Sequence, residues 1–336
     1  MALHVAALFV YLFLAIDIAA QEDITGQTFN EYLDEKHKNF STYVVKIFDN
    51  IDKSISRWVK ESDNNETSED ETVSAIDEFF KSEKFIEETE KSFFRIRLGS
   101  LFQSKSSTKF NQKISAQIPL SRTKKSFQLF IDDAEKNYFS SAVSETSSDS
   151  STEIGVNYFA PLYKGIKSKY SIGIKSFSTY VKARYSKDFK NQDWLLQPTQ
   201  QFVYSTKYDF SEETNIYLNK TLDENSIFRT TLHRKTRSHV DGFDYAVAFA
   251  YYLTLSQKKG FSLTQQFWGN SKYTCEVEPQ RYSGISSYSS FASWRQNIFR
   301  KWISFEIKSG VDFHRQYEYE PNYIVEFNVD FYFGNI

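Results

Sequence analysis

Apolar residues recur along this chain with two different periods. Between residues 28 and 60 they follow the 3.6-residue period of an amphipathic helix, and charged residues lie between them. The positions that carry this period are Phe29, Leu33, Phe40, Val44, Ile47, Ile51, Ile55 and Trp58. A second, shorter helix is expected over 72–90, starting at a capping Thr72. The stretch 61–71 between them is rich in acids and lacks any base, which predicts a solvated acidic linker.

From Phe93 onward the period changes to two, as in a strand with one apolar and one polar face. In the first such segment Phe94 and Ile96 alternate with Arg95 and Arg97. The same alternation returns in segment after segment up to the C-terminus. It predicts about fourteen strands of about 8 to 13 residues each.

A soluble β-sandwich also alternates, so three further features favour a membrane barrel. The segment length matches the roughly 9–11 residues that a tilted strand needs to cross a bilayer. Aromatic residues gather at strand ends, as in an interfacial girdle, and charged residues occupy the middle of the polar face, as in a wet lumen. In lipid a sheet must close on itself to pair its backbone groups. The expected fold is an all-β transmembrane barrel of about 14 antiparallel strands, or 12, preceded by a short α-helical periplasmic segment.

The first twenty residues resemble an export signal. An apolar stretch ends in Ala19 and Ala20, and it is too short for a comfortable membrane span. An uncleaved anchor is the alternative. The expected organisation is a signal peptide over 1–20, a helical periplasmic segment over 21–91 and an outer-membrane barrel over 92–336.

Composition removes several classes of protein. Lys and Arg (41) nearly balance Asp and Glu (43), for a net charge of −2, so a nucleic-acid binder with a basic footprint is not expected. The single cysteine, Cys275, excludes an internal disulfide framework and a Cys-rich metal site. A mean hydropathy of −0.53 excludes a bundle of transmembrane helices, although 18% of the residues are aromatic. A barrel with one wet face reconciles these two properties.

The connections between predicted strands indicate an orientation. With the helical segment in the periplasm, odd-numbered connections face outward, and the longer ones fall there: 133–150, 269–286 and 314–322. Shorter ones fall on the other side: 222–226, 254–259 and 299–301, although 187–195 is an exception. Long outer loops and short periplasmic turns are typical of bacterial outer-membrane barrels. The N-terminal helices and the C-terminus are therefore expected in the periplasm.

Several short stretches resemble an uncharacterised family of proteobacterial outer-membrane β-barrel proteins. They are Ala75-Ile-Asp-Glu-Phe-Phe80, Phe94-Arg-Ile-Arg-Leu98, Pro119 with Lys124-Lys-Ser-Phe-Gln-Leu-Phe130, Tyr180-Val-Lys-Ala-Arg184, Gln197-Pro-Thr-Gln-Gln-Phe202 and Trp302-Ile-Ser-Phe-Glu306. The resemblance covers residues 75–334 and implies a barrel with a preceding helical segment. It implies no activity and no functional residue.

The charged residues on the polar face are the candidate functional groups. Bases belong to early strands and acids to late ones: Arg95, Arg97, Lys109, Lys113, Lys169, Lys175, Lys182 and Arg184, then Asp244, Glu306, Asp312, Glu326 and Asp330. Closure places the last strand beside the first, so Asp330 and Glu326 are expected to face Arg95 and Arg97. One interpretation is structural ion pairing inside the barrel. The other is a transverse field across a water-filled eyelet that orients polar solutes.

Catalysis is the least favoured hypothesis. His233, His239 and His314 fall at outer strand ends or in outer loops, Ser238 is adjacent to His239, and Ser309 is on the lipid-facing register. A nucleophile and its base must meet within hydrogen-bond reach, which spacing alone does not establish. No enzyme, cofactor or metal site is expected, and Cys275 is interpreted as an incidental exposed thiol.

The expected function is a passive pore for small polar solutes or a structural envelope component. The alternative is an envelope-assembly or interaction protein that acts through its periplasmic helices, and an outer-membrane hydrolase comes third. Expected partners are outer-membrane lipid and lipopolysaccharide, and the outer-membrane assembly machinery through the last strand. The helix over 28–60 is expected to pack on the helix over 72–90, to dock on or plug the periplasmic mouth, or to bind a partner.

Overall fold

The computed structural model describes ten segments of the chain: 29–56, 71–80, 93–120, 127–133, 152–207, 209–239, 241–256, 258–274, 281–298 and 300–333. The expected signal peptide, nearly all of the acidic linker and Cys275 lie outside these residues, as do 57–60 and 81–90 of the two predicted helices.

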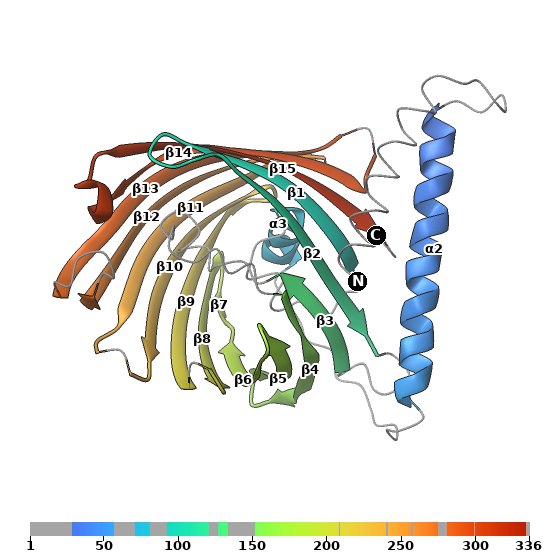
Figure 1. Ribbon diagram of the computed structural model, residues 1–336, viewed down its shortest axis with the longest axis horizontal. Coiled ribbons are helices and arrows are strands. Elements are labelled where there is room, and N and C mark those ends of the chain that lie inside the picture. Colours follow the sequence, from blue (N-terminus) through green and yellow to red (C-terminus); the bar gives the residue numbers. More distant parts are fainter. Residues whose placement is uncertain are drawn as a thin grey trace.

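Antiparallel strands make up most of the described chain (Figure 1). Their bounds are β1 Phe93–Gln103, β2 Lys109–Pro119, β3 Phe127–Asp133, β4 Thr152–Tyr163, β5 Ile166–Lys175, β6 Ser178–Lys187, β7 Phe189–Asn191, β8 Trp194–Ser205, β9 Asp209–Asp223, β10 Ser226–Arg237, β11 Asp244–Ser256, β12 Lys259–Thr274, β13 Arg281–Asn297, β14 Ile303–His314 and β15 Pro321–Phe333. A short 3₁₀ helix, Arg315–Tyr317, precedes β15.

Two strand pairings complete the ring, and one of them joins the two ends of the sheet. The first strand pairs with the last, with Phe94 opposite Phe333, and β6 pairs with β8, with Ala183 opposite Phe202. The three-residue β7 pairs with β8 alone and is a branch of the wall. The ring therefore contains fourteen strands, which confirms the predicted fold and strand count.

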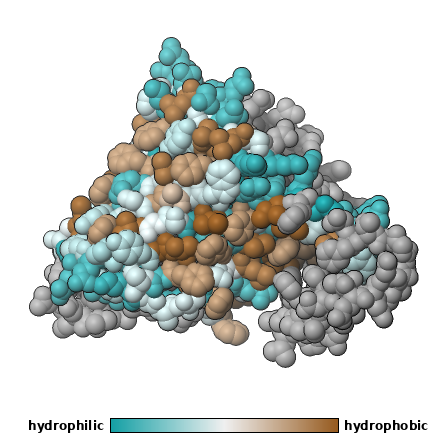
Figure 2. Space-filling model, turned by 90° about the horizontal axis from the view of Figure 1, so that it is seen from above, coloured by the Kyte–Doolittle hydropathy of each residue, from teal (hydrophilic) through white to brown (hydrophobic). Residues whose placement is uncertain are grey.

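The two faces of the wall differ as the alternation predicts. Along β8 the hydrophilic Gln197, Thr199 and Gln201 are buried inside the barrel, whereas Leu196 and Tyr204 are exposed outside it. Figure 2 shows apolar residues grouped across the middle of the visible face and hydrophilic residues toward its margins. An apolar exterior around a polar interior is the arrangement of a membrane barrel, because the outer side chains then contact acyl chains.

Helix α2 (Phe29–Ser56) lies outside the barrel, at the rim where β1 begins and β15 ends, which we call the β1 rim (Figure 1). Phe40 packs edge-on against Phe94 and Phe333, the first and last apolar residues of this seam. The His37 ring stacks on Trp302 at 4.0 Å between centroids, and its Nε2 donates to the Tyr332 carbonyl at 2.8 Å. These contacts are all at the β1 rim, where Phe94 and Phe333 face outward, so α2 docks on the outer edge of that rim.

Helix α3 (Glu71–Phe80) lies within the barrel, so the expected packing of the two helices on each other is wrong (Figure 1). It begins one residue before the predicted cap, and Thr72 therefore lies inside the helix. Neither described helix is long and apolar enough to cross a membrane.

Acid is expected to loosen α2 from the rim. Burial lowers the pKa of His37 below its ordinary value of 6.5, although the Tyr332 carbonyl and Asp34 oppose the shift. Undocked His37 therefore binds more protons than docked His37 just below pH 6.5, and docking weakens as the pH falls through that window. Amide hydrogen exchange in α2, corrected for intrinsic rates, should accelerate between pH 7.5 and 5.5. A His37→Gln variant should lack this dependence, and equal pH dependence in both proteins would contradict the assignment.

Candidate functional site

The lumen wall is the candidate site, because all the charged residues singled out in the sequence share its register. In the strand pairing, each of the thirteen lies opposite other residues of the inner face. Examples are the pairs Arg97–Lys113, Arg97–Asp330 and Lys182–Ser171. The strand register therefore places all thirteen charged residues on the inner face of the wall. Hydrogen bonds continue this hydrophilic surface across β2 to β5.

One such chain of hydrogen bonds joins four strands. The Ser171 hydroxyl donates to Asn157 Oδ1 at 2.7 Å, Asn157 Nδ2 donates to Gln128 Oε1 at 3.0 Å, and Gln128 Nε2 donates to Gln117 Oε1 at 3.4 Å. All four side chains are buried within the barrel. Buried amides and hydroxyls need such partners, and here neighbouring strands supply them across the wall.

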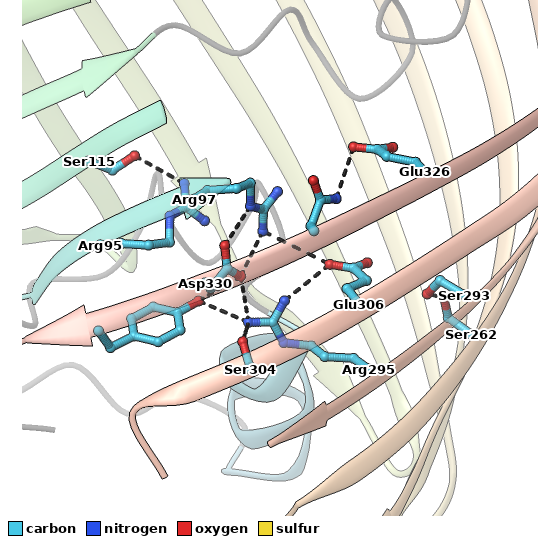
Figure 3. A network of polar contacts seen from close by, with 12 residues as sticks. Arg95, Arg97, Ser115, Ser262, Ser293, Arg295, Ser304, Glu306, Glu326 and Asp330 are labelled. Carbon is cyan, nitrogen blue, oxygen red and sulfur yellow. Dashed lines mark hydrogen bonds and ion pairs between the residues drawn. The ribbon is translucent and has the colours of Figure 1, made fainter. Parts of the chain in front are cut away.

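The densest cluster lies on the inner face where β1 meets β15 (Figure 3). Arg97 binds Asp330 through two parallel bonds, Nε to Oδ1 at 2.6 Å and Nη2 to Oδ2 at 3.0 Å. Arg295 from β13 donates to the same Asp330 at 2.9 Å and to Glu306 at 3.1 Å. Both Asp330 and Arg295 are only 1% exposed, so each charge depends on the other for solvation. We call Arg97, Arg295, Glu306 and Asp330 the seam cluster.

Neutral groups complete the seam cluster. Arg295 Nη2 also donates to the Ser304 hydroxyl at 2.6 Å and lies 2.9 Å from the Tyr332 hydroxyl, which donates to Asp330 at 3.2 Å. Arg95 turns instead toward β2, where it donates to the Ser115 hydroxyl at 3.0 Å.

Glu326 is not where the sequence placed it. It lies opposite Leu101 and accepts a bond from Asn328 at 2.9 Å, so it faces neither Arg95 nor Arg97. The reason is register: each two-residue step along β15 moves its partner two residues along β1, and Asp330 already occupies the position opposite Arg97. Arg97 and Asp330 are neighbours on one wall rather than opponents across the lumen. The structural interpretation therefore fits this cluster better than a transverse field.

The remaining predicted charges are spread around the wall. Lys175 pairs with Glu153 at 2.5 Å, Asp244 accepts from Asn270 and Arg237, and Asp312 accepts from Ser287 at 2.7 Å. The bases on β5 and β6 lie on a different part of the ring from the seam cluster; they are Lys169, Lys182 and Arg184. On β2, Lys113 lies opposite Arg97 and Lys109 lies opposite Leu101.

Sequence reasoning missed Arg295, although a signal was present. It follows Trp294 on β13 and shares its face with Ser293 and Ser289, which are also buried and polar. The alternation that placed Trp294 on the apolar face therefore placed Arg295 in the lumen.

A second site missed by the sequence holds α3 inside the barrel. Both carboxylate oxygens of Asp77 accept bonds from Arg229 on β10, each at 2.8 Å. Arg229 also donates to Asn219 at 2.6 Å, and its guanidinium lies within 6 Å of the ring centres of Tyr217 and Tyr252. Both charged side chains are almost completely buried. An ion pair with this geometry and these extra partners fixes the helix in one position.

Apolar contacts complete the seat of α3. The buried residues that pack together there are Val73, Ile76 and Phe80 from the helix and Leu195, Ile227, Ala250 and Tyr252 from the wall. Leu195 and Ile227 are the second residues of β8 and β10. The turns that precede these strands, 192–193 and 224–225, belong to the β1 rim. The helix therefore occupies the lumen near that rim.

Gly260 on β12 provides space for this helix. A Cβ atom there would lie 2.4 Å from Phe79 Cε1 and 2.8 Å from Phe80 Cζ. A Gly260→Val variant is expected to weaken the seating of α3 by about 1–3 kcal/mol through overpacking, without touching Asp77 or Arg229. Amide exchange in α3 should accelerate correspondingly. Unchanged exchange would show that the helix is held elsewhere.

The candidate nucleophile and bases do not form a catalytic pair. The Ser238 hydroxyl donates to the Phe210 carbonyl, and its neighbour His239 instead contacts Asp209 at 2.8 Å in an exposed pair. His233 Nδ1 contacts the amide oxygen of Asn215 at 2.7 Å. His314 Nδ1 accepts the Gln316 N–H. Ser309 is exposed on the outer face, as predicted. Among the described residues no group of three or more His, Cys, Asp or Glu side chains is placed to hold a metal ion.

No family model matches this chain, and no curated protein does. Solved structures that resemble it include a loop L8 deletion mutant of OmpT, an outer membrane protein of Vibrio cholerae, at 9% identity and a TM-score of 0.46, covering 72% of this chain and 98% of that one. The structure of Pseudomonas aeruginosa OccK10 (OpdN) matches 72% of this chain and 98% of its own, at 6% identity and a TM-score of 0.43. The structure of the KdgM porin in complex with disordered oligogalacturonate matches 70% of this chain and 98% of its own, at 7% identity and a TM-score of 0.36. These likenesses are weak, so the barrel assignment depends on the strand pairing of the chain itself, and the resemblance over 75–334 is not supported by a family match.

Proposed function

We propose that the protein is an outer-membrane pore for small polar solutes, narrowed near the β1 rim by α3. The observation that carries this proposal is the closed ring with hydrophilic side chains inside and apolar side chains outside. Water and polar solutes partition into such a lumen, and the outer face holds the ring in lipid. The β1 rim, with its short turns and docked α2, would face the periplasm.

Conductance of the refolded full-length protein in a planar bilayer tests the pore. We expect discrete steps in conductance when the protein inserts into the bilayer, and none in a bilayer without inserted protein. Silence of a correctly inserted barrel would refute the pore. Silence combined with capture of periplasmic partners would favour the envelope-assembly function, and silence combined with lipid hydrolysis would favour an enzyme.

Charge selectivity tests whether the lumen bases face the permeating ions. Lys109 is exposed at the inner face of β2, outside the seam cluster. A Lys109→Glu variant is expected to shift the reversal potential toward cation preference, because charged rings in a pore select ions of opposite sign. Lys301→Glu, at an exposed turn of the rim, makes the same change in net charge away from the lumen and should leave the potential unchanged. Equal shifts in both variants would contradict conduction along this wall.

A further inference from the structure

Helix α2 carries different chemistry on each of its flanks. At 3.6 residues per turn, one flank contains only aromatic, basic and amide side chains and no acid. These residues are Tyr32, Lys36, Asn39, Tyr43, Lys46 and Asn50. Lys36 Nζ lies 5.1 Å from the Tyr32 ring centre, so charge and ring are held together. Tyrosine is enriched at membrane–water interfaces, and helices that lie in such an interface carry basic residues on their polar face.

The opposite flank is acidic. Glu31, Asp34 and Asp49 lie there with Lys38, and Glu35 lies at the border between this flank and the basic one. Asp34 pairs at 2.5 Å with Arg300 in a turn of the β1 rim, which orients the helix about its own axis. Positive and negative charges therefore face different surroundings.

Between these flanks runs the stripe that contacts the barrel. His37 and Phe40 pack on Phe333, which belongs to the apolar outer face of the wall. Tyr43 and Ile47 border this stripe on the basic side, and they remain 61% and 37% exposed. The apolar surface of α2 thus continues the lipid-facing surface of the barrel and extends past its edge.

We propose that the basic flank of α2 binds an anionic phospholipid surface, with Tyr43 and Ile47 inserted among the headgroups. Each of the three surfaces of α2 then has its own surroundings: the apolar stripe contacts the barrel, the basic flank contacts lipid, and the acidic flank faces water. The partner is a lipid leaflet because the exposed apolar residues are continuous with the lipid-facing wall and the adjacent charges are basic. This placement depends on the barrel being in a membrane and not on its conducting solutes.

Site-specific fluorescence in vesicles tests the lipid contact. In the full-length Cys275→Ser protein, an environment-sensitive label is placed at Tyr43→Cys or Ile47→Cys, with Thr42→Cys on the water side as the matched control. Vesicles of phosphatidylethanolamine and phosphatidylglycerol carry shallow spin-labelled lipids. Lipid quenching should be strong at 43 and 47 and weak at 42. Equal quenching at all three positions would overturn the proposal. If instead the label at position 43 becomes shielded from water in detergent, and this shielding increases with protein concentration, a second copy of the chain covers the residue and the proposal is overturned.

Charge dependence separates lipid binding from simple proximity. Lys36→Gln and Lys46→Gln should each lower the ratio of lipid-bound to unbound α2 by about fivefold in phosphatidylglycerol vesicles. Lys38→Gln, on the acidic flank, should leave it unchanged, and none of the three should matter in phosphatidylcholine alone. Equal effects of Lys36→Gln and Lys38→Gln would contradict recognition by the basic flank. The label measurement reports on α2 whether or not the barrel conducts, so this proposal and the pore can fail separately.

Discussion

Replacing Asp330 with alanine is expected to lower the free energy of unfolding of the barrel by about 3–5 kcal/mol. The carboxylate neutralises both Arg97 and Arg295, and its loss leaves the two buried guanidinium groups to share the carboxylate of Glu306. The damage falls on the pair of strands that closes the ring. Urea unfolding in detergent micelles, followed by the mobility of the unheated protein on a gel, measures it.

Glu326→Ala is the matched control, because it removes an acid from the same face of the same strand. Glu326 accepts a bond from Asn328 and lies outside the seam cluster, so its loss should cost no more than about 1.5 kcal/mol. Similar losses in the two variants would contradict a specific role of the seam cluster in closure.

Replacing Asp77 with alanine is expected to release α3 from the lumen. Arg229 would remain buried between Tyr217 and Tyr252 with no carboxylate among its bonded partners, at a cost of about 3–5 kcal/mol to the seated state. That cost shifts the seated-to-released ratio by a factor of about 10² to 4 × 10³. Unitary conductance in a planar bilayer should then rise above that of the unmodified protein.

Two variants make this result specific. Ala75→Ser changes an exposed position of the same helix and should leave the conductance unchanged. Arg229→Gln in the Asp77→Ala background removes the charge that the seated helix leaves buried, so it should restore part of the seating and bring the conductance back toward that of the unmodified protein. An unaltered conductance in Asp77→Ala, with α3 shown to exchange freely, would mean that the helix does not narrow the path.

The barrel itself was accessible from sequence because alternation is a local property. Neighbouring residues of each strand, such as Phe94 and Arg95, show which face is apolar and which is polar. Closure follows because every backbone group must be paired in lipid. Closure also predicted that acids of the last strand would lie beside Arg95 and Arg97, and Asp330 lies opposite Arg97. The exact step along β15 did not, because register depends on the whole pairing, and Glu326 was misplaced for that reason.

The seat of α3 was inaccessible for a different reason. Asp77 and Arg229 are 152 residues apart, and each is unremarkable in its own segment. Apolar residues on an amphipathic helix demand burial but do not specify against which surface. Ile227 and Leu195 interrupt a polar face in the sequence, and only the closed barrel shows that they meet Val73 and Ile76.

Collisional accessibility along β5 tests the orientation of the wall most directly. In the Cys275→Ser background, single spin labels at positions 169, 170, 171 and 172 are compared in vesicles with oxygen, which concentrates in lipid, and with a water-soluble nickel chelate. Tyr170 and Ile172 are expected to favour oxygen, and Lys169 and Ser171 the chelate. A uniform preference for the chelate, or the reverse alternation, would contradict a barrel whose outer face lies in acyl chains and whose interior is wet.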